Sequence, residues 1–274
     1  MRLATVRVEG GECLAAATDG GYRRLAGARD LAELLRAGVD PTALPLGDPV
    51  EGELAAPLRP GKVVAIGLNY LDHIRESSLP RPERPLVFAK LPSSVIGPGD
   101  AIELDEELAT RVDWEVELAV VVGRRMRRVA ERDALDHVFG YTVGNDVSAR
   151  DVQFSESQWI RAKSFDTFCP LGPVVVSAGE IPDPQALALR TRVNGELMQD
   201  STTAEMVFGV AELLAFCSRS FTLEPGDVVL TGTPWGCGEF MDPPRSLHPG
   251  DVVETEIEGI GTLRNPVRAV GPSA

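Results

Sequence analysis

The chain has 274 residues, of which 43% are hydrophobic and 25% are charged. This composition excludes disordered, collagen-like and coiled-coil proteins, and the length allows one large hydrophobic core with a small additional unit. The 41 acidic residues outnumber the 27 basic ones, giving a formal net charge of −14. Such a surface repels phosphate backbones and anionic lipids, so we expect neither nucleic acid nor a membrane as a partner. The basic run at residues 124–128 is then interpreted as a solvated turn.

The cysteines and the apolar segments indicate a cytoplasmic location. Four cysteines occur without any Cys-x-x-Cys pair, so we expect neither a disulfide framework nor a structural zinc site. The longest purely apolar runs, such as residues 118–122, are much shorter than the roughly 20 residues of a membrane span. No secretory signal is visible at the N-terminus.

Residues 1–60 are expected to form a small N-terminal domain and a linker. Alternating strand patterns flank glycine turns at 10–11 and 19–21, and a short helix follows, with Asp30 as its N-cap and Gly38 as its stop signal. Residues 41–60 contain five prolines and no steady periodicity, which favours a linker. We therefore place the domain boundary near residue 61, and residues 61–274 form the main domain.

Strand patterns dominate the main domain. They are expected at 62–66, 86–89, 114–122, 141–143, 174–176, 188–193, 228–230 and 252–257. The best helical pattern spans 203–219, and a shorter helix is expected at 131–138. The tripeptide Pro-Gly-Asp occurs three times, each time as a turn before a strand. Many short strands with few helices predict a mostly β, α+β fold with a rolled or barrel-like sheet.

Acidic residues are unexpectedly frequent at the start of the apolar segment 113–122. Glu115 and Glu117 alternate along a strand, so their side chains point the same way, about 6.5 to 7 Å apart. In a poorly hydrated place such a pair must protonate, find cations or bind a divalent metal. Asp146, after the strand-like residues 140–144, is the third candidate ligand. The alternative is an edge strand with a solvated acidic face.

His73 and Glu76 form a second candidate group. They lie three residues apart after a probable strand, so on a helical turn they share one face. A carboxylate next to a histidine orients the ring and makes it a better proton acceptor, although a surface histidine would show the same spacing. Lys163 lies among apolar residues and is either a cation near the metal or a snorkelling side chain. The glycines of 231–238 could present backbone N–H groups to a substrate carboxylate, or form a plain turn.

These residues together resemble the fumarylacetoacetate hydrolase family over residues 62–267. The similarity rests on segments 67–76, 113–118, 140–151, 163–172 and 231–238, in the order of the family. The resemblance implies a mixed β-roll, a homodimer, and Mg²⁺ or Mn²⁺, with Ca²⁺ as a substitute in crystals. The implied metal ligands are Glu115, Glu117 and Asp146.

The resemblance also implies an activity and roles for individual residues. Members of this family cleave a carbon–carbon bond in acylpyruvates, or decarboxylate, isomerise or hydrate similar diacids. The expected substrate is therefore a small keto acid. By resemblance, His73 assisted by Glu76 activates water and Lys163 stabilises negative charge. The residues expected to contact substrate are Gln153, Thr233 and Arg150.

Our first hypothesis is a metal-dependent hydrolase that cleaves a β-diketo acid of the fumarylpyruvate or fumarylacetoacetate type. The alternative keeps the metal site but decarboxylates an oxaloacetate-type acid, or isomerises or hydrates a 2-hydroxyhepta-2,4-diene-1,7-dioate-type acid. A non-catalytic metal-binding protein is a third interpretation, against which the His73–Glu76 pair argues. A serine nucleophile is disfavoured because no Gly-x-Ser-x-Gly motif occurs.

Overall fold

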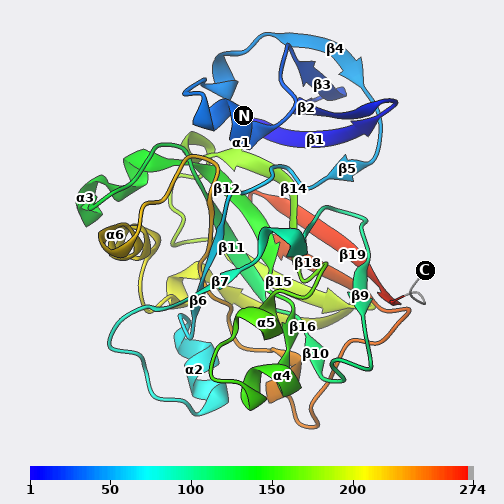
Figure 1. Ribbon diagram of the computed structural model, residues 1–274, viewed down its shortest axis with the longest axis vertical. Helices are drawn as coiled ribbons and strands as arrows, with labels where there is room; N and C mark the ends of the chain where they lie inside the picture. Colours follow the sequence, from blue (N-terminus) through cyan, green and yellow to red (C-terminus); the bar gives the residue numbers. More distant parts are fainter. Residues whose placement is uncertain (271–274) are drawn as a thin grey trace.

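The computed structural model describes residues 1–270, which form an α+β fold made mostly of β-strands (Figure 1). The predicted fold class is therefore confirmed. The largest sheet has twelve strands; ten follow one another in the order β4-β3-β2-β1-β14-β12-β11-β17-β6-β7, while β5 pairs with β1 and β8 with β14. Its strands are β1 (Arg2–Val8), β2 (Gly11–Thr18), β3 (Gly21–Leu25), β4 (Leu46–Val50), β5 (Leu54–Ala55), β6 (Val63–Gly67), β7 (Leu86–Lys90), β8 (Val95–Ile96), β11 (Val116–Val122), β12 (Val138–Asn145), β14 (Cys169–Ser177) and β17 (Val228–Leu230).

A second, five-stranded sheet packs within the same body, and a short strand pair completes the β structure. The second sheet has the order β16 (Glu196–Thr202), β15 (Ala188–Val193), β18 (Val252–Ile257), β19 (Gly261–Ala269) and β9 (Ile102–Leu104). The pair is formed by β10 (Val112–Asp113) and β13 (Ser148–Ala149). The helices are α1 (Leu31–Arg36), α2 (Leu71–Ser77), α3 (Glu131–Ala134), α4 (Arg150–Ser155), α5 (Ile160–Lys163) and α6 (Val210–Ser220). No helix within residues 1–270 is long and apolar enough to cross a membrane.

The N-terminal strands extend the large sheet. β1 pairs antiparallel with β14, and Leu31 of α1 shares a hydrophobic cluster with Val121 and Val228 of the main domain (Figure 1). The expectation that residues 41–60 form a linker is wrong, because β4 and β5 lie in this segment. Pro49 is accommodated within β4 because this is the outermost strand, where a missing N–H costs little.

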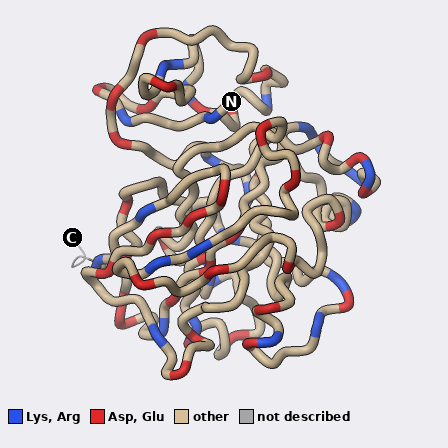
Figure 2. The backbone as a smooth tube through the Cα atoms, turned by 180° about the vertical axis from the view of Figure 1, so that it is seen from behind, with Lys and Arg blue, Asp and Glu red and all other residues tan. Residues whose placement is uncertain are grey.

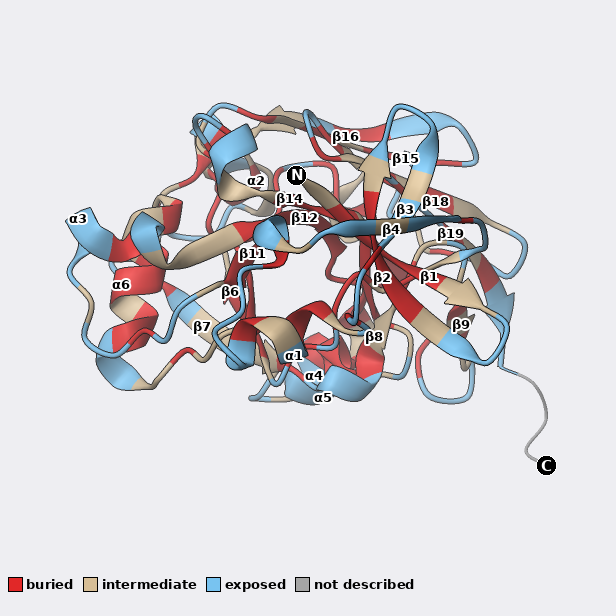
Figure 3. Cartoon of the chain, turned by 90° about the horizontal axis from the view of Figure 1, so that it is seen from above, coloured by how far each residue is buried: buried red, intermediate tan, exposed pale blue. Residues whose placement is uncertain are grey.

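Helix α6 is shorter than its sequence pattern predicts. The helix begins at Val210 rather than at Thr203, because residues 203–205 form a separate 3-10 turn that Thr202 caps. Met206 then forms an isolated β-bridge with Tyr70. Most residues of α6 are buried, Ala211, Glu212 and Phe216 are half-buried, and only Arg219 and Ser220 at its C-terminal end are exposed (Figure 3). The amphipathic spacing therefore predicted the buried residues of α6 but not the residue at which the helix begins.

The three Pro-Gly-Asp segments form turns, as predicted. Their glycines, Gly99, Gly226 and Gly250, have φ of +79°, +82° and +100°, a region that side chains with a Cβ rarely adopt. Acidic and basic residues are interspersed along the backbone (Figure 2). All four cysteines are free and buried, consistent with the expected lack of disulfides.

Strand β11 is the central element of the main domain. All seven of its residues are buried between β12 and β17. The strand begins at Val116 rather than at Trp114, because residues 114 and 115 lie between β10 and β11. Val116 pairs with Asn145 of the antiparallel neighbour β12, so the start of one strand adjoins the end of the other. This register brings the residues before β11 next to those after β12.

Candidate functional site

Three buried carboxylates meet where β11 begins and β12 ends. Single oxygens of Glu115, Glu117 and Asp146 all lie within 4.8 Å of one another, and the residues are only 5%, 1% and 0% exposed. The predicted grouping is therefore confirmed, and the alternative of a solvated acidic face is wrong.

Backbone groups fix the orientation of these acids. The N–H of Asp146 donates to the carbonyl of Glu115 at 2.9 Å, which continues the pairing of β11 with β12 beyond Asn145. The side chain of Asn145 accepts from the N–H of Glu115 at 3.0 Å. The carboxylate of Glu117 accepts from the N–H of Gly232 at 2.7 Å. These contacts fix the backbone of Glu115 and Asp146, and in Glu117 they hold the carboxylate itself.

Two buried lysines neutralise part of this negative charge. Nζ of Lys163 lies 2.7 Å from Glu115 and 3.0 Å from Asp146. Lys90, at the end of β7, pairs with the other oxygen of Asp146 and donates to the carbonyl of Val147. Lys163 therefore lies beside the candidate metal site, as predicted. Lys90 was not selected from the sequence, because lysines are rarely fully buried and its partner Asp146 is distant along the chain.

The electrostatics of the three acids fit a divalent cation. Burial opposes ionisation of Glu115, but the charges of Lys163 and Arg150 outweigh it and lower its pKa. Burial, together with repulsion from Asp146 and Glu115, raises the pKa of Glu117 well above its usual value. Glu117 forms no ion pair with any residue of the described part of the chain. A divalent ion would supply the missing charge, and an all-oxygen ligand set suits Mg²⁺ or Mn²⁺.

Arg150 is buried and forms two ion pairs and one further hydrogen bond. Its guanidinium donates to Asp113 at 2.8 Å, to Glu115 at 2.5 Å and to Gln153 at 3.0 Å. Burial raises the pKa of Asp113 to about 6, against the opposing charge of Arg150. Arg150 and Gln153 thus form a hydrogen bond with each other, and their contact with substrate stays a prediction. Asp113 was not selected from the sequence, although it continues the alternation of Glu115 and Glu117.

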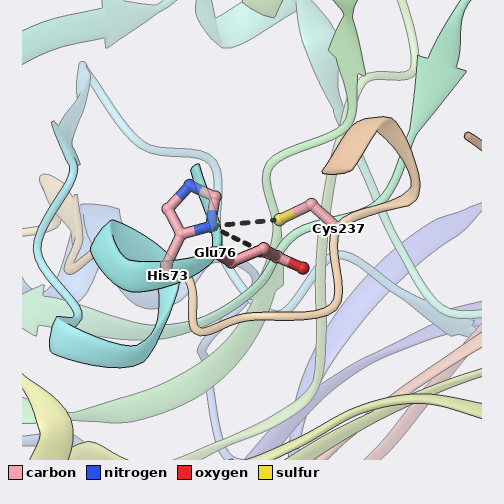
Figure 4. Close-up of side chains that lie close together, drawn as sticks. All are labelled: His73, Glu76 and Cys237. Atoms are coloured by element: carbon pink, nitrogen blue, oxygen red, sulfur yellow. Dashed lines mark hydrogen bonds and ion pairs between the residues drawn. The ribbon is translucent and has the colours of Figure 1, made fainter. Parts of the chain in front are cut away.

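His73 and Glu76 lie on helix α2 and contact each other, as their spacing predicts (Figure 4). Nδ1 of His73 is 3.1 Å from an oxygen of Glu76. The ring of Phe240 packs edge-on against His73, and the guanidinium of Arg150 lies over the same phenyl ring. Phe240 therefore connects the histidine to the ion-pair cluster of the carboxylate site.

The glycine-rich segment 231–238 joins the two groups. Gly232 donates its N–H to Glu117, and Gly236 donates its N–H to Glu76 at 2.8 Å. These two N–H groups, which the sequence suggested for a substrate carboxylate, therefore bind carboxylates of the protein itself. Thr233, a predicted substrate contact, accepts a hydrogen bond from Gln199 of β16 at 2.9 Å. Gln199 also accepts from the N–H of Val116, a role that a single glutamine in a strand does not reveal.

We expect Gly236→Ala to lower activity and to destabilise the protein by about 1 to 3 kcal/mol. Gly236 has φ +93°, and an added Cβ would lie 2.1 Å from the carbonyl oxygen of Met198. The loop must move to relieve this clash, which withdraws the N–H that holds Glu76. Thermal unfolding and steady-state kinetics measure the two effects. Gly179→Ala is the matched control, because its Cβ meets nothing within 4 Å. Wild-type activity in Gly236→Ala would contradict this role of the loop.

Comparison with known proteins places this site in a family context. The family model described as fumarylacetoacetate (FAA) hydrolase C-terminal matches residues 62–268. A relative in Xenopus laevis, named a mitochondrial oxaloacetate tautomerase, is 51% identical over 217 residues, which are 78% of this chain and 68% of the relative.

Two solved structures share the fold over nearly the whole chain. A fumarylacetoacetate hydrolase from Exiguobacterium antarcticum superimposes with a TM-score of 0.89 at 39% identity, covering 98% of this chain and 100% of the other. A 2-hydroxyhepta-2,4-diene-1,7-dioate isomerase from Mycobacterium marinum gives a TM-score of 0.82 at 37% identity, covering 99% and 100%. The similar proteins thus carry the names of three different reactions on one fold.

Proposed function

Because the chain belongs to the fumarylacetoacetate hydrolase family, we propose that this enzyme interconverts the enol and keto forms of oxaloacetate or a closely related 2-oxo diacid. The similarity to a named oxaloacetate tautomerase, at 51% identity, supports this reaction. It favours the alternative hypothesis, an enzyme that decarboxylates an oxaloacetate-type acid or isomerises or hydrates a 2-hydroxyhepta-2,4-diene-1,7-dioate-type acid, over carbon–carbon hydrolysis. The proposed metal is Mg²⁺ or Mn²⁺.

The observation that carries the proposal is the pair of buried His73 and half-buried Glu76 near the three carboxylates. Ketonisation removes the proton of the enol hydroxyl and adds a proton to the adjacent carbon, so it needs one group that can accept and return a proton. The contact with Glu76 assigns the N–H of His73 to Nδ1 and leaves the lone pair of Nε2 for proton exchange. Phe240 and the buried surroundings keep the ring in place.

Glu115, Glu117 and Asp146 are the residues that would hold the metal. When bound, the metal supplies Lewis-acid stabilisation of the negative charge that develops on the 2-oxygen of the substrate. Lys163 adds a fixed positive charge next to two of these carboxylates. The protein thus combines a proton carrier with charge stabilisation, and neither requires a covalent intermediate.

A second candidate reaction is the isomerisation of a 2-hydroxyhepta-2,4-diene-1,7-dioate-type acid. The similarity to the solved isomerase from Mycobacterium marinum favours it. The chemistry is the same proton shift, extended over a conjugated diene. The two reactions therefore differ in the length of the substrate rather than in the catalytic groups.

The test compares four reactions on the Mg²⁺-loaded protein: oxaloacetate tautomerisation, dienedioate isomerisation, release of CO₂ from oxaloacetate, and release of pyruvate from acylpyruvates. We expect the largest kcat/KM for tautomerisation and loss of activity with EDTA. A larger kcat/KM for pyruvate release would restore the hydrolase hypothesis. Activity that persists after verified metal removal would contradict metal dependence.

His73→Asn is expected to lower kcat by about 10²- to 10⁴-fold, the usual contribution of a general acid–base group. Glu76→Gln should have a smaller effect in the same direction, because it keeps a hydrogen-bond acceptor but loses the charge. The measurement is the rate of tautomerisation with saturating Mg²⁺. His248→Asn, at an exposed position, is the matched control. An unchanged kcat in His73→Asn would exclude the proposed proton carrier.

A further inference from the structure

A second set of potential metal ligands lies next to the carboxylate site. Nδ1 of His73, a carboxylate oxygen of Glu76 and Sγ of Cys237 all lie within 4.8 Å of one another (Figure 4). Nδ1 is 3.1 Å from Glu76 and 4.0 Å from the sulfur. Helix α2 supplies two of these groups and the glycine-rich segment supplies the third. The proposed reaction uses no chemistry of the thiol, so its position is unexplained by that function.

We propose that His73, Glu76 and Cys237 form a transition-metal site and that Zn²⁺ bound there inhibits the enzyme. The inhibition, but not the binding, rests on the proposed function. Imidazole and thiolate ligands favour Zn²⁺ over Mg²⁺, which prefers oxygen. Tetrahedral Zn²⁺ at its usual bond lengths holds its ligand atoms about 3.3 to 3.8 Å apart. The observed separations of 3.1 and 4.0 Å bracket this range, so small side-chain movements suffice.

The charges and the neighbouring groups fit this ion. One thiolate and one carboxylate balance the two charges of Zn²⁺, so the occupied site carries no net charge in a buried place. The N–H of Gly236 holds the other oxygen of Glu76 at 2.8 Å, and Nε2 of Gln199 lies 3.9 Å from Sγ of Cys237. Such supporting hydrogen bonds orient metal ligands and increase affinity. A Zn²⁺ ion with three protein ligands commonly takes water as its fourth ligand.

Binding would remove the proton carrier from the reaction. The S–H bond of Cys237 breaks as the S–Zn bond forms, and its proton passes to the buffer. Nδ1 of His73 gives up its proton to coordinate Zn²⁺, and Nε2 gains one, so the net release is a single proton. The lone pair that would exchange a proton with substrate is then protonated, and Glu76 is occupied by the metal. Zn²⁺ therefore inhibits without displacing Mg²⁺ from the carboxylates.

The binding test uses Co²⁺ as a spectroscopic substitute for Zn²⁺ on the full-length, Mg²⁺-loaded protein. We expect a sulfur-to-cobalt charge-transfer band that saturates at a single equivalent and disappears when Zn²⁺ is added. The band should persist in Cys13→Ala, a control at another buried cysteine, and be lost in Cys237→Ala. Cys237→Ser replaces the alanine variant if that variant does not fold. Absence of the band in the folded wild type, or its persistence without Cys237, overturns the site.

The inhibition test titrates Zn²⁺ against tautomerisation in excess Mg²⁺, with each rate expressed relative to the zinc-free rate of the same variant. We expect the inhibition constant to rise at least about tenfold in Cys237→Ala, because groups that only support a metal ligand already contribute about 10- to 100-fold. Equal sensitivity of wild type and Cys237→Ala overturns the inhibitory role. Should the wild type not tautomerise oxaloacetate, the proposed function fails, while the cobalt band still decides whether the site exists.

Discussion

Glu117→Gln is expected to abolish Mg²⁺-dependent activity and at the same time to raise the thermal stability of the metal-free protein. Glu117 is the buried carboxylate without an ion pair among the described residues, and burial and its acidic neighbours raise its pKa. A raised pKa means that the ionised form destabilises the fold at neutral pH, so a neutral amide relieves that cost. The same amide loses the charge that would bind the metal.

The loss of activity should be about 10²- to 10⁴-fold, because Lewis-acid stabilisation contributes several kcal/mol and each 1.4 kcal/mol is about tenfold. Thermal unfolding with and without Mg²⁺ provides the second readout. Saturating ligand at about 100 times its Kd stabilises a protein by about 2.7 kcal/mol, and this gain should vanish in the variant. Glu107→Gln, at an exposed position, is the control. A variant that keeps its Mg²⁺-induced stabilisation would remove Glu117 from the ligand set.

Lys90→Met is expected to destabilise the metal-free protein by about 3 to 5 kcal/mol, the usual cost of removing one partner of a buried ion pair. The side chains of Lys90 and Asp146 are both fully buried. Without this lysine, Lys163 and Arg150 are the cationic partners that residues 1–270 leave to the three carboxylates. A divalent ion would then replace the missing charge, so Mg²⁺ should stabilise the variant more than it stabilises the wild type.

Chemical denaturation in EDTA and in Mg²⁺ measures both expectations for Lys90→Met. The matched control is Arg268→Met, which removes a solvent-exposed pair with Glu103 and should cost about 0 to 1 kcal/mol. A loss of stability in Lys90→Met no greater than in the control would mean that Lys90 does not compensate the carboxylate cluster. If Mg²⁺ stabilised Lys90→Met and the wild type equally, Lys90 and the metal would not compensate the same negative charge.

Local patterns in the sequence determined the chemistry of the candidate site. Alternation placed Glu115 and Glu117 on the same side, and a spacing of three placed His73 and Glu76 together on a helix, because both relations follow from backbone geometry within a few residues. The position of Asp146 after a strand-like segment suggested it as the third ligand, and the many short strands predicted the fold class; the resemblance to a known family agreed with both. Local patterns were wrong where pairing with distant segments determines the structure. They predicted a linker at 41–60, where β4 pairs with β3, and a helix that starts at Thr203 rather than at Val210.

Only the tertiary structure decided which charges compensate one another. Lys90 lies 56 residues from Asp146, and Cys237 lies 164 residues from His73, so their contacts depend on strand register and on the path of the glycine-rich segment. Pairing of β11 with β12 places Asp146 beside Glu115, and no short-range pattern encodes that alignment. Sequence identifies side chains able to hold a metal or carry a proton, whereas long-range packing determines their partners and therefore their charge states.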